Sequence, residues 1–349
     1  MSEKKIKVAI VGASGYSGKE LLRLLLMHEN VDLVCATSRQ SAGQKVSEVF
    51  PRFRGGKAED LVFVQPDIDV IAASGAQCAF LALPHGVAVD FAEDLVEKGL
   101  RVIDLSADFR LEDTAVYLEY YDKEHPSPEL MKEAVYGLPE VYAEEIKPAR
   151  LVASPGCYPT SIILPLIPVL KAGLIDVDSI TVSSISGASG AGKKADTSLL
   201  FVEINESVRA YGAPKHRHLS EIEQELSHAA GQTLQLTFIP HLMPVTAGIH
   251  STTFATLSES GNSKAVSDAL TEAYTDSSFV RLLGEGVFPD TKNVVGTNFI
   301  DIGWVIDQRT GRLVLFSAED NLGKGASSQA LQSFNLMFDL PEKAGLLHF

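Results

Sequence analysis

A glycine-rich loop between a strand and a helix is the feature that most constrains the fold of this chain. The apolar run Ile6–Val11 leads directly into Gly12-Ala-Ser-Gly15-Tyr-Ser-Gly18. Leucines at helical spacing follow over residues 18–28. Glycines three residues apart allow a tight turn, the approach of a diphosphate to backbone N–H groups, and close packing of the helix on the strand. The pattern predicts a dinucleotide-binding unit, whereas a purely structural glycine turn would not need these flanking elements.

The same alternation of apolar strands and amphipathic stretches continues through the first half of the chain. It recurs over residues 31–37, 79–83, 87–98 and 101–105, and predicts a Rossmann-type, doubly wound parallel sheet. After Cys157 the pattern changes to longer strand candidates that read as antiparallel. They cover residues 180–186, 234–239, 249–257, 299–306 and 313–318, with helices expected over 221–229 and 263–276. The sequence therefore predicts an α/β domain followed by an α+β domain with a mainly antiparallel sheet.

The domain boundaries follow from length and from the C-terminal segment. A chain of 349 residues exceeds the size at which one hydrophobic core usually stops growing. Residues 327–338 place Ala330, Leu331, Phe334 and Phe338 at helical spacing, so we expect a terminal helix that returns to the first domain. We predict an NADP-binding domain over residues 1–156 and 322–349, and a catalytic and dimerisation domain over residues 157–321.

The end of the second predicted strand favours NADP over NAD. NAD-binding sites usually carry an Asp or Glu there to hold the ribose 2′-hydroxyl. This strand ends in Thr37-Ser38-Arg39, and Asp32 lies at its beginning instead. A hydroxyl beside a guanidinium suits a 2′-phosphate, because Arg offers charged donors in a fork.

The charge balance limits the partners of the protein. Its formal net charge is −15, which opposes binding to nucleic acid or an anionic membrane in the absence of a strong basic patch. The short clusters Lys193-Lys194 and Lys215-His-Arg-His218 indicate a small anionic ligand. The start MSEKK lacks the apolar segment of a secretory signal, and the longest apolar runs fall short of the roughly 20 residues of a membrane span. We expect a cytoplasmic protein.

Cys157 is the candidate nucleophile among three cysteines. Their odd number and irregular spacing argue against a disulfide framework and a Cys-based metal site. Cys35 and Cys78 lie in apolar strand-like runs, as inert buried thiols do. Cys157, in Ser154-Pro-Gly-Cys-Tyr-Pro-Thr160, lies between a strand and a helix with an early Pro159, where helical N–H groups favour a thiolate. The structural alternative is a small Cys that fills a strand-to-helix corner.

A thiol nucleophile needs a proton carrier, and the compact cluster that contains His216 and His218 offers two. If the segment is extended, its alternation places both histidines on one side, facing the cleft. Zinc binding is a weak alternative because no third and fourth ligands have suitable spacing, so we predict no metal. We expect His85 to line the nicotinamide pocket, and His241 and His250 to be structural strand residues.

Two further loops are candidate anion sites. Ser186-Gly-Ala-Ser-Gly-Ala-Gly192 can present backbone N–H groups as a nest ahead of Lys193. Asp104-Leu-Ser-Ala-Asp-Phe-Arg110 places Arg110 beyond a strand end, where it can hold a phosphate or pair with Asp108 or Glu112 instead.

These motifs together resemble one family along the whole chain, the N-acetyl-gamma-glutamyl-phosphate reductases of arginine biosynthesis. The resemblance rests on sequence blocks spread over both predicted domains. They are GASGYSG at 12–18, LPHG at 83–86, DLSADFRL at 104–111, YGLPE at 136–140, PGCYPT at 155–160, SGASGAGKK at 186–194, HRH at 216–218 and DNLGKGA at 320–326.

The resemblance implies roles for individual residues. It makes Cys157 the nucleophile and His216 the acid and base. The implied substrate contacts are Arg110, Ser154, Tyr211 and His218, and the expected NADP contacts are Gly12, Ser14, Gly15, Tyr16, Ser17, Gly18, Ser38, Arg39, Pro84, Ser189, Gly190 and Asn321. The family commonly has Asn where this chain has Ser154, so a polar substrate contact falls to a shorter hydroxyl or is lost.

The implied reaction is the reduction of an acyl phosphate through a thioester on Cys157, with NADPH as the hydride donor. Sister enzymes that reduce aspartyl phosphate or a carrier-linked aminoadipyl phosphate use the same chemistry and remain alternatives. A binding protein that senses NADP without catalysis is a further alternative, but it would be expected to have lost Cys157 or His216. The resemblance also implies a homodimer or homotetramer.

Overall fold

The computed structural model describes residues 5–193 and 195–347, and the chain divides into two compact units. The first unit contains residues 1–114, 125–155 and 326–349, and the second contains residues 115–124 and 156–325. Of the predicted basic cluster Lys193-Lys194, only Lys193 lies within the described residues. Met1 to Lys4 also lie outside them.

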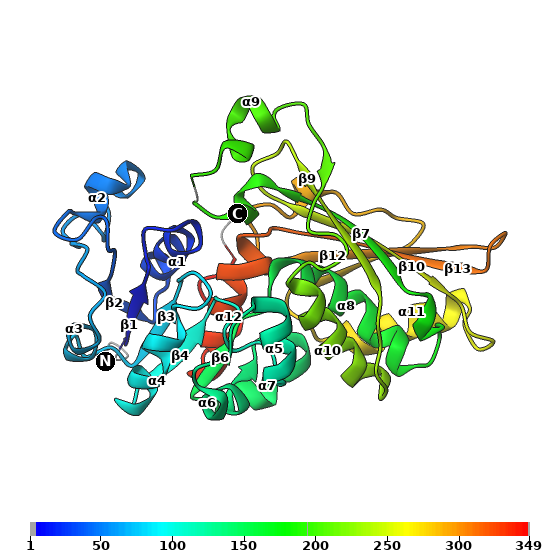
Figure 1. Ribbon diagram of the computed structural model, residues 1–349, viewed down its shortest axis with the longest axis horizontal. Coiled ribbons are helices and arrows are strands. Elements are labelled where there is room, and N and C mark those ends of the chain that lie inside the picture. Colours follow the sequence, from blue (N-terminus) through cyan, green and yellow to red (C-terminus); the bar gives the residue numbers. More distant parts are fainter. Residues whose placement is uncertain (1–4, 194, 348–349) are drawn as a thin grey trace. The chain divides into compact units, whose positions relative to one another are not determined.

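The first unit is built on a six-stranded parallel sheet (Figure 1). The strand order is β2-β1-β3-β4-β6-β5, and every neighbouring pair is parallel. Its strands are β1 (Ile6–Val11), β2 (Val31–Ala36), β3 (Cys78–Leu81), β4 (Arg101–Asp104), β5 (Val135–Tyr136) and β6 (Leu151–Ala153). Its helices are α1 (Tyr16–Met27), α2 (Val46–Val49), α3 (Ile68–Ala73), α4 (Val89–Glu97), α6 (Pro128–Glu133), α7 (Pro139–Ile146) and α12 (Ser328–Met337). The prediction of a doubly wound parallel sheet is confirmed.

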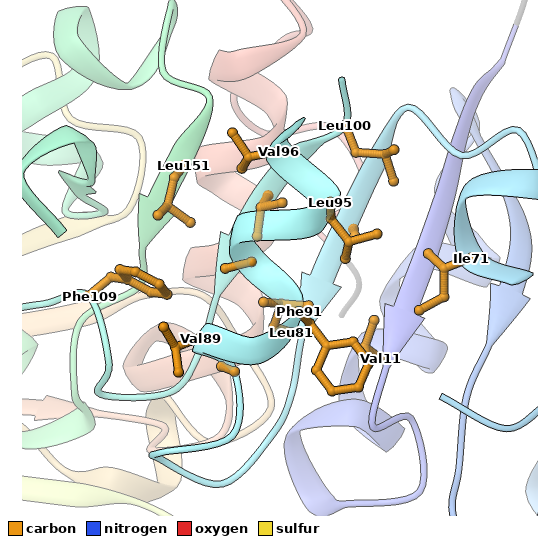
Figure 2. Packing of buried hydrophobic residues seen from close by; sticks show 14 of the residues in the cluster. Val11, Ile71, Leu81, Val89, Phe91, Leu95, Val96, Leu100, Phe109 and Leu151 are labelled. Atoms are coloured by element: carbon orange, nitrogen blue, oxygen red, sulfur yellow. The ribbon is translucent and has the colours of Figure 1, made fainter. Parts of the chain in front are cut away.

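Helix α4 shows how this sheet is covered. Its buried residues Val89, Phe91, Leu95 and Val96 recur at the spacing of one helical face. Figure 2 shows them packed with Leu81 and other apolar side chains of the strands in one core. Burial of such side chains contributes about 1.5–3 kcal/mol each, so this core fixes the strand ends on which the loops of the first unit are mounted.

The terminal helix α12 packs in the first unit, as predicted. Asn335 Oδ1 lies 3.0 Å from His28 Nε2, and the Phe334 and Phe80 rings are 5.7 Å apart. Ser327, just before α12, donates a hydrogen bond to the backbone oxygen of Ser17 in the nucleotide loop. The end of the chain therefore supports the beginning of α1.

The second unit is built on a seven-stranded mixed sheet in the order β11-β12-β13-β10-β7-β9-β8. Four neighbouring pairs are antiparallel, but β7 with β9 and β11 with β12 are parallel. Its strands are β7 (Thr181–Gly187), β8 (Arg209–Ala210), β9 (Thr237–Met243), β10 (Ile249–Thr256), β11 (Val280–Glu285), β12 (Ile300–Asp307) and β13 (Arg312–Glu319). The expectation of a mainly antiparallel sheet is confirmed, although two strand pairs run parallel.

The helices of the second unit include α8 (Cys157–Lys171), α9 (Phe201–Ile204), α10 (His218–Ala230) and α11 (Ser263–Tyr274). Helix α5 (Thr114–Tyr121) begins at the boundary and groups mainly with this unit. Helix α8 is apolar on all sides and packs against α10, α11, β10 and β13. Ser161 Oγ on α8 lies 2.7 Å from Ser251 Oγ on β10, which fixes the helix on the sheet.

Candidate active site

The nucleotide loop of the first unit has the geometry that its glycines predict. Gly12 directly follows β1 with φ +88°, and a Cβ atom there would come within 2.4 Å of the Ala82 backbone oxygen. A Cβ atom on Gly18 would come equally close to the oxygen of Gly12. Gly15 is the N-cap of α1 and contributes no capping side chain. Larger residues would close this cradle, and the first N–H groups of α1 are therefore suited to a diphosphate.

The end of β2 lies beside this loop. Ser38 donates a hydrogen bond to Ser14 Oγ over 2.9 Å, which joins two predicted cofactor residues. Arg39 is exposed and lines a cavity of about 760 Å³ together with Pro66, Ile68 and the acidic residues of α4. Asp32 is exposed near the beginning of β2, away from the strand end. These residues fit a nicotinamide dinucleotide, and Arg39 offers a cation directly after the end of β2.

The LPHG and DLSADFRL motifs hold each other in place. The buried Asp108 carboxylate accepts hydrogen bonds from Gly86 N–H over 2.6 Å and from Val89 N–H over 3.3 Å. Asp104 is also fully buried, and burial raises its pKa to about 7. Both motifs thus shape the loops after β3 and β4, and they leave the predicted cofactor residue Pro84 exposed, together with His85.

Arg110 has backbone partners in the structure. Its Nε donates to the Ser154 oxygen over 2.8 Å and its Nη2 donates to the Leu105 oxygen over 3.0 Å. The guanidinium therefore ties the loops after β4 and β6 together. The Ser154 side chain is fully buried, and its hydroxyl has no hydrogen-bond partner in the described part of the chain. A buried hydroxyl in this state costs about 1–3 kcal/mol, which a polar ligand atom would recover.

Cys157 is the first residue of α8 in the second unit. Gly156 is the N-cap in an extended conformation, and Pro159 lies in the first turn, where the missing N–H costs no hydrogen bond. The Cys157 side chain is half-buried, whereas Cys35 and Cys78 are buried. Burial raises the pKa of Cys35 to about 11 and raises that of Cys78 further. Of the three thiols, Cys157 is the one with the exposure and helix position of a nucleophile.

A buried carboxylate supports this helix end. Glu221 on α10 is 2% exposed and accepts a hydrogen bond from Gly156 N–H over 2.7 Å. Gly325 also lies against Cys157, since a Cβ atom on Gly325 would come within 2.9 Å of the Cys157 Cβ. Sequence reasoning missed both residues. Glu221 lies one helical turn after His218, and Gly325 belongs to DNLGKGA, so a search for neighbours of the predicted site could have found them.

His216 and His218 are close together, but not because the segment is extended. Arg217 has helical dihedral angles and His218 begins α10, so the expectation of an extended strand is wrong. The turn brings the two rings to 4.9 Å between centroids. The Nδ1 atom of His216 accepts a hydrogen bond from His218 N–H over 3.1 Å. Both side chains nevertheless line the same cavity as Cys157.

The environment keeps the His216 ring neutral. Burial, with a smaller effect of the Arg217 charge, lowers the pKa of His216 to about 4. Because Nδ1 accepts a backbone hydrogen bond, the neutral ring carries its proton on Nε2. His216 is therefore prepared to donate a hydrogen bond from Nε2 at neutral pH.

The cavity around Cys157 has a volume of about 430 Å³. Tyr158 and Tyr211 lie in its wall, with 2.9 Å between their hydroxyl oxygens. Two cations and one carboxylate also line it: Arg209, Arg217 and Asp196. Lys215 belongs to the predicted basic cluster but forms an ion pair with Glu119 on α5 at 3.0 Å. The cavity therefore suits a small anionic molecule, held by the arginines rather than by Lys215.

The loop after β7 and the DNLGKGA segment meet at Asn321. Asn321 Nδ2 donates to Ser189 Oγ over 2.9 Å, while its Oδ1 accepts a hydrogen bond from Gly248 N–H over 2.8 Å. Gly190 lies nearby and lines the cavity. Three predicted cofactor residues are thus brought together in the second unit. His241 and His250 lie in strands β9 and β10, as expected.

The described ranges contain no helix long and apolar enough to cross a membrane. Within the same residues, no group of three or more His, Cys, Asp and Glu side chains is arranged to hold a metal ion.

Two family models match this chain over most of its length. The semialdehyde dehydrogenase NAD-binding domain matches residues 7–149, and the semialdehyde dehydrogenase dimerisation domain matches residues 157–321. The chain therefore belongs to the semialdehyde dehydrogenase family.

Curated relatives identify the branch of this family. The N-acetyl-gamma-glutamyl-phosphate reductase of Akkermansia muciniphila is 59% identical over 98% of this chain and 99% of its own. Those of a Geobacter species and of Heliobacterium modesticaldum are 51% and 46% identical, each over 98% of both chains. Within the family, the chain belongs to the N-acetyl-gamma-glutamyl-phosphate reductases.

Solved structures with low sequence identity share the fold. Aspartate semialdehyde dehydrogenase II from Vibrio cholerae matches with a TM-score of 0.73 at 19% identity, over 96% of this chain and 99% of that one. Aspartate semialdehyde dehydrogenase with NADP from Candida albicans matches with a TM-score of 0.72 at 16% identity, over 98% and 99% of the two chains.

Proposed function

We propose that the protein reduces N-acetyl-glutamyl 5-phosphate to N-acetyl-glutamate 5-semialdehyde and phosphate, a step of arginine biosynthesis. The observation that carries the proposal is the half-buried Cys157 at the N-terminus of α8, in a cavity shared with His216 and His218. The relatives that are 46–59% identical over nearly the full length are named for this reductase activity. A thiol in such a position is suited to attack an activated acyl group.

The first half of the reaction forms a thioester. The Cys157 thiol gives up its proton, and Sγ attacks the carbonyl carbon of the acyl phosphate. The bond from this carbon to the phosphate oxygen breaks, and phosphate leaves with the electron pair. The N–H groups at the start of α8 stabilise the oxyanion of the tetrahedral intermediate, and Arg209 and Arg217 supply positive charge for the anionic substrate.

The second half releases the aldehyde. Bound NADPH would supply the hydride that reduces the thioester carbon. His216 donates a hydrogen bond from Nε2 to the developing alkoxide of the hemithioacetal, since its neutral ring carries a proton there. The alkoxide then re-forms the carbonyl, the carbon–sulfur bond breaks, and Cys157 leaves as the thiolate. His218 lies beside Gly156 and is proposed to accept the thiol proton in the first half or to contact the substrate.

The remaining predicted contacts divide between the two units. We propose that residues 1–156 and 322–349 form the NADP-binding domain and that residues 157–321 form the catalytic and dimerisation domain. The glycine loop with Ser14, Tyr16 and Ser17 would hold the diphosphate, and Ser38 and Arg39 the 2′-phosphate. We propose that Pro84, Ser189, Gly190 and Asn321 contact NADP, with Asn321 at the nicotinamide, and that Arg110, Ser154 and Tyr211 contact the substrate.

We also propose a cytoplasmic homodimer or homotetramer. The match of residues 157–321 to a dimerisation domain supports the homo-oligomer. The reducing environment of the cytoplasm would keep the reactive Cys157 thiol in the form that the reaction needs.

The test of substrate identity is phosphate-dependent reduction of NADP by the purified protein. N-acetylglutamate semialdehyde and aspartate semialdehyde are compared at equal concentrations. We expect kcat/KM to favour the N-acetylated substrate by at least tenfold. A preference for aspartate semialdehyde would overturn the assignment and favour the sister reaction.

A further inference from the structure

An aromatic box of four rings surrounds the His216 side chain in the second unit. The centroid distances from His216 are 4.9 Å to His218, 5.6 Å to Tyr211, 5.6 Å to Phe238 and 5.7 Å to Tyr158. The interplanar angles lie between 70° and 88°. Edge-to-face pairs of aromatic rings prefer separations of about 4.5–7 Å, so all four contacts are favourable. The box joins residues that are far apart along the chain and therefore exists only in the folded unit.

The aromatic box limits the orientations that are open to His216. Its Nδ1 accepts the His218 N–H over 3.1 Å, and a Cβ atom on Gly212 would come within 2.9 Å of its Cδ2. Close packing on several sides leaves a side chain few rotamers. Because Nδ1 is engaged by the backbone, Nε2 is the ring nitrogen that can serve a molecule in the Cys157 cavity.

Tyr158 is the member of the aromatic box that is joined directly to the nucleophile. It follows Cys157 in the first turn of α8 and is 2% exposed. Its ring also contacts the rings of His218 at 6.0 Å and Phe238 at 5.2 Å. The helix that carries the thiol therefore also carries a ring that touches both histidines of the site.

The hydroxyl of Tyr158 holds a second residue of the cavity wall. Its oxygen lies 2.9 Å from that of Tyr211, whose ring is itself part of the aromatic box. Burial raises the pKa of both phenols, that of Tyr211 to about 12, so both hydroxyls keep their protons at neutral pH. One hydroxyl then donates to the other. Tyr158, Tyr211 and His216 thus form a closed set of contacts.

We propose that Tyr158 is a positioning residue. Its ring fixes the orientation of the His216 ring relative to Cys157, and its hydroxyl fixes the Tyr211 side chain in the cavity wall. The ring should affect kcat because it acts through His216, whereas the hydroxyl should affect KM because Tyr211 is a proposed substrate contact. These effects on the reaction rest on the proposed function, but the effect on the orientation of His216 does not.

The kinetic test compares Tyr158→Leu, which removes the ring and the hydroxyl, with Tyr158→Phe, which removes only the hydroxyl. The assay is phosphate-dependent reduction of NADP with N-acetylglutamate semialdehyde. We expect kcat to fall by at least tenfold in Tyr158→Leu. Tyr158→Phe should recover most of that loss but keep a severalfold higher KM for the semialdehyde. Wild-type kcat in Tyr158→Leu, or an equal loss in both variants, would overturn the role of the ring, and a wild-type KM in Tyr158→Phe that of the hydroxyl.

Tyr274→Leu is the matched control in the same unit. Tyr274 is a buried tyrosine of α11 whose hydroxyl donates to the Leu164 oxygen on α8 over 2.5 Å, and it does not line the Cys157 cavity. We expect its melting temperature to fall as in Tyr158→Leu, while kcat stays near the wild-type value. A loss of kcat as large as that in Tyr158→Leu would show that removal of any buried tyrosine suffices, and would overturn the positioning role.

Nitrogen NMR of protein with isotope-labelled histidine observes the His216 ring without the reaction. Its signals are those that disappear in His216→Gln. At pH 7.5 we expect a single tautomer with the proton on Nε2 in the wild type and in Tyr158→Phe, and a mixture of tautomers in Tyr158→Leu. Wild-type signals in Tyr158→Leu, or a mixture in Tyr158→Phe, would overturn the proposed orientation.

Two features of the design keep its outcomes separate. Tyr158→Phe preserves the ring packing, so its KM and its His216 signals test the proposal even where Tyr158→Leu does not fold. If the wild type itself shows no phosphate-dependent reduction of NADP, the proposed function fails, while the NMR signals still decide whether Tyr158 orients His216.

Discussion

The His218 ring lies directly against Gly156, the residue before the nucleophile. A Cβ atom on Gly156 would come within 2.6 Å of His218 Nε2, a distance that real side chains do not adopt. The glycine at this position therefore allows a histidine to approach the N-terminus of α8. The relationship joins the PGC motif at 155–157 and the HRH motif at 216–218, which are far apart in the sequence, into one site.

Substitution of Gly156 by Ala is predicted to displace His218 and to lower kcat by at least tenfold. The added methyl group needs a shift of the ring or of the first turn of α8, and small misplacements at a reacting group cost large factors in rate. Steady-state kinetics measure the effect, with Gly56→Ala as the control, where the nearest atom to the new Cβ is 3.4 Å away. Wild-type kcat in Gly156→Ala would show that the close approach has no role in catalysis.

Substitution of Glu221 by Ala is predicted to lower both kcat and the melting temperature. It removes the acceptor of the Gly156 N–H and leaves a buried donor unpaired, at a cost of about 1–3 kcal/mol. Glu223→Ala is the control on the same helix, because Glu223 accepts the Leu236 N–H over 3.0 Å and does not line the Cys157 cavity. We expect a similar decrease in melting temperature in the two variants, but a decrease in kcat only in Glu221→Ala. Equal kcat in the two variants would argue against a positioning role.

Substitution of Arg39 by Ala is predicted to raise KM for NADPH by about tenfold or more and to leave KM for NADH nearly unchanged. Arg39 is the cation at the end of β2 that would pair with the 2′-phosphate, a group that NADH lacks. Initial rates with the two cofactors measure the ratio. A parallel increase of both KM values would contradict the assignment of Arg39 to the 2′-phosphate.

The low pKa of His216 makes a prediction about stability and pH. An unfolded histidine has a pKa of about 6.5, and the folded value is about 4, so the unfolded state binds a proton first as the pH falls. The contribution of the neutral His216 ring to the free energy of unfolding is fully present above pH 6.5 and is lost as the pH falls toward 4. His216→Gln should therefore lose less stability than the wild type between pH 7.5 and 5, by about 2 kcal/mol. Calorimetry at several pH values tests this difference, and identical pH profiles would contradict it.

Most of the fold could be predicted from the sequence because the patterns that indicate its helices and strands are local. Three patterns depend only on neighbouring residues, and each corresponds to an element of the structure. They are the glycine loop, the alternation of strands and helices, and the helical spacing of Ala330, Leu331 and Phe334. Strand β11 was missed, since Val280–Glu285 contains Arg281 and Gly284 and lacks a clear alternation. Strand β9 begins and ends later than predicted, because Pro240 and His241 interrupt the apolar pattern although the segment pairs with β7.

The active site could be predicted only in part from the sequence, because its contacts join residues that are far apart along the chain. Cys157 and the two histidines stand out by residue type, but the turn at Arg217 depends on the start of α10 and not on strand periodicity. The support from Glu221 depends on the packing of α10 against α8, which no local pattern reports. Arg110 reads as a candidate phosphate ligand from its place after a strand, and its backbone partners become visible only when the loops after β4 and β6 meet.

The most direct test of the account is a single-turnover experiment without phosphate. Purified protein is mixed with N-acetylglutamate semialdehyde and NADP, and the NADPH formed is compared with the concentration of Cys157. Without phosphate to release the acyl group, we predict a burst of one NADPH per Cys157 and an N-acetylglutamyl adduct on the Cys157 peptide by mass spectrometry. Cys157→Ala should bind NADP but give neither signal. A burst without the adduct, or a burst in Cys157→Ala, would contradict covalent catalysis at Cys157.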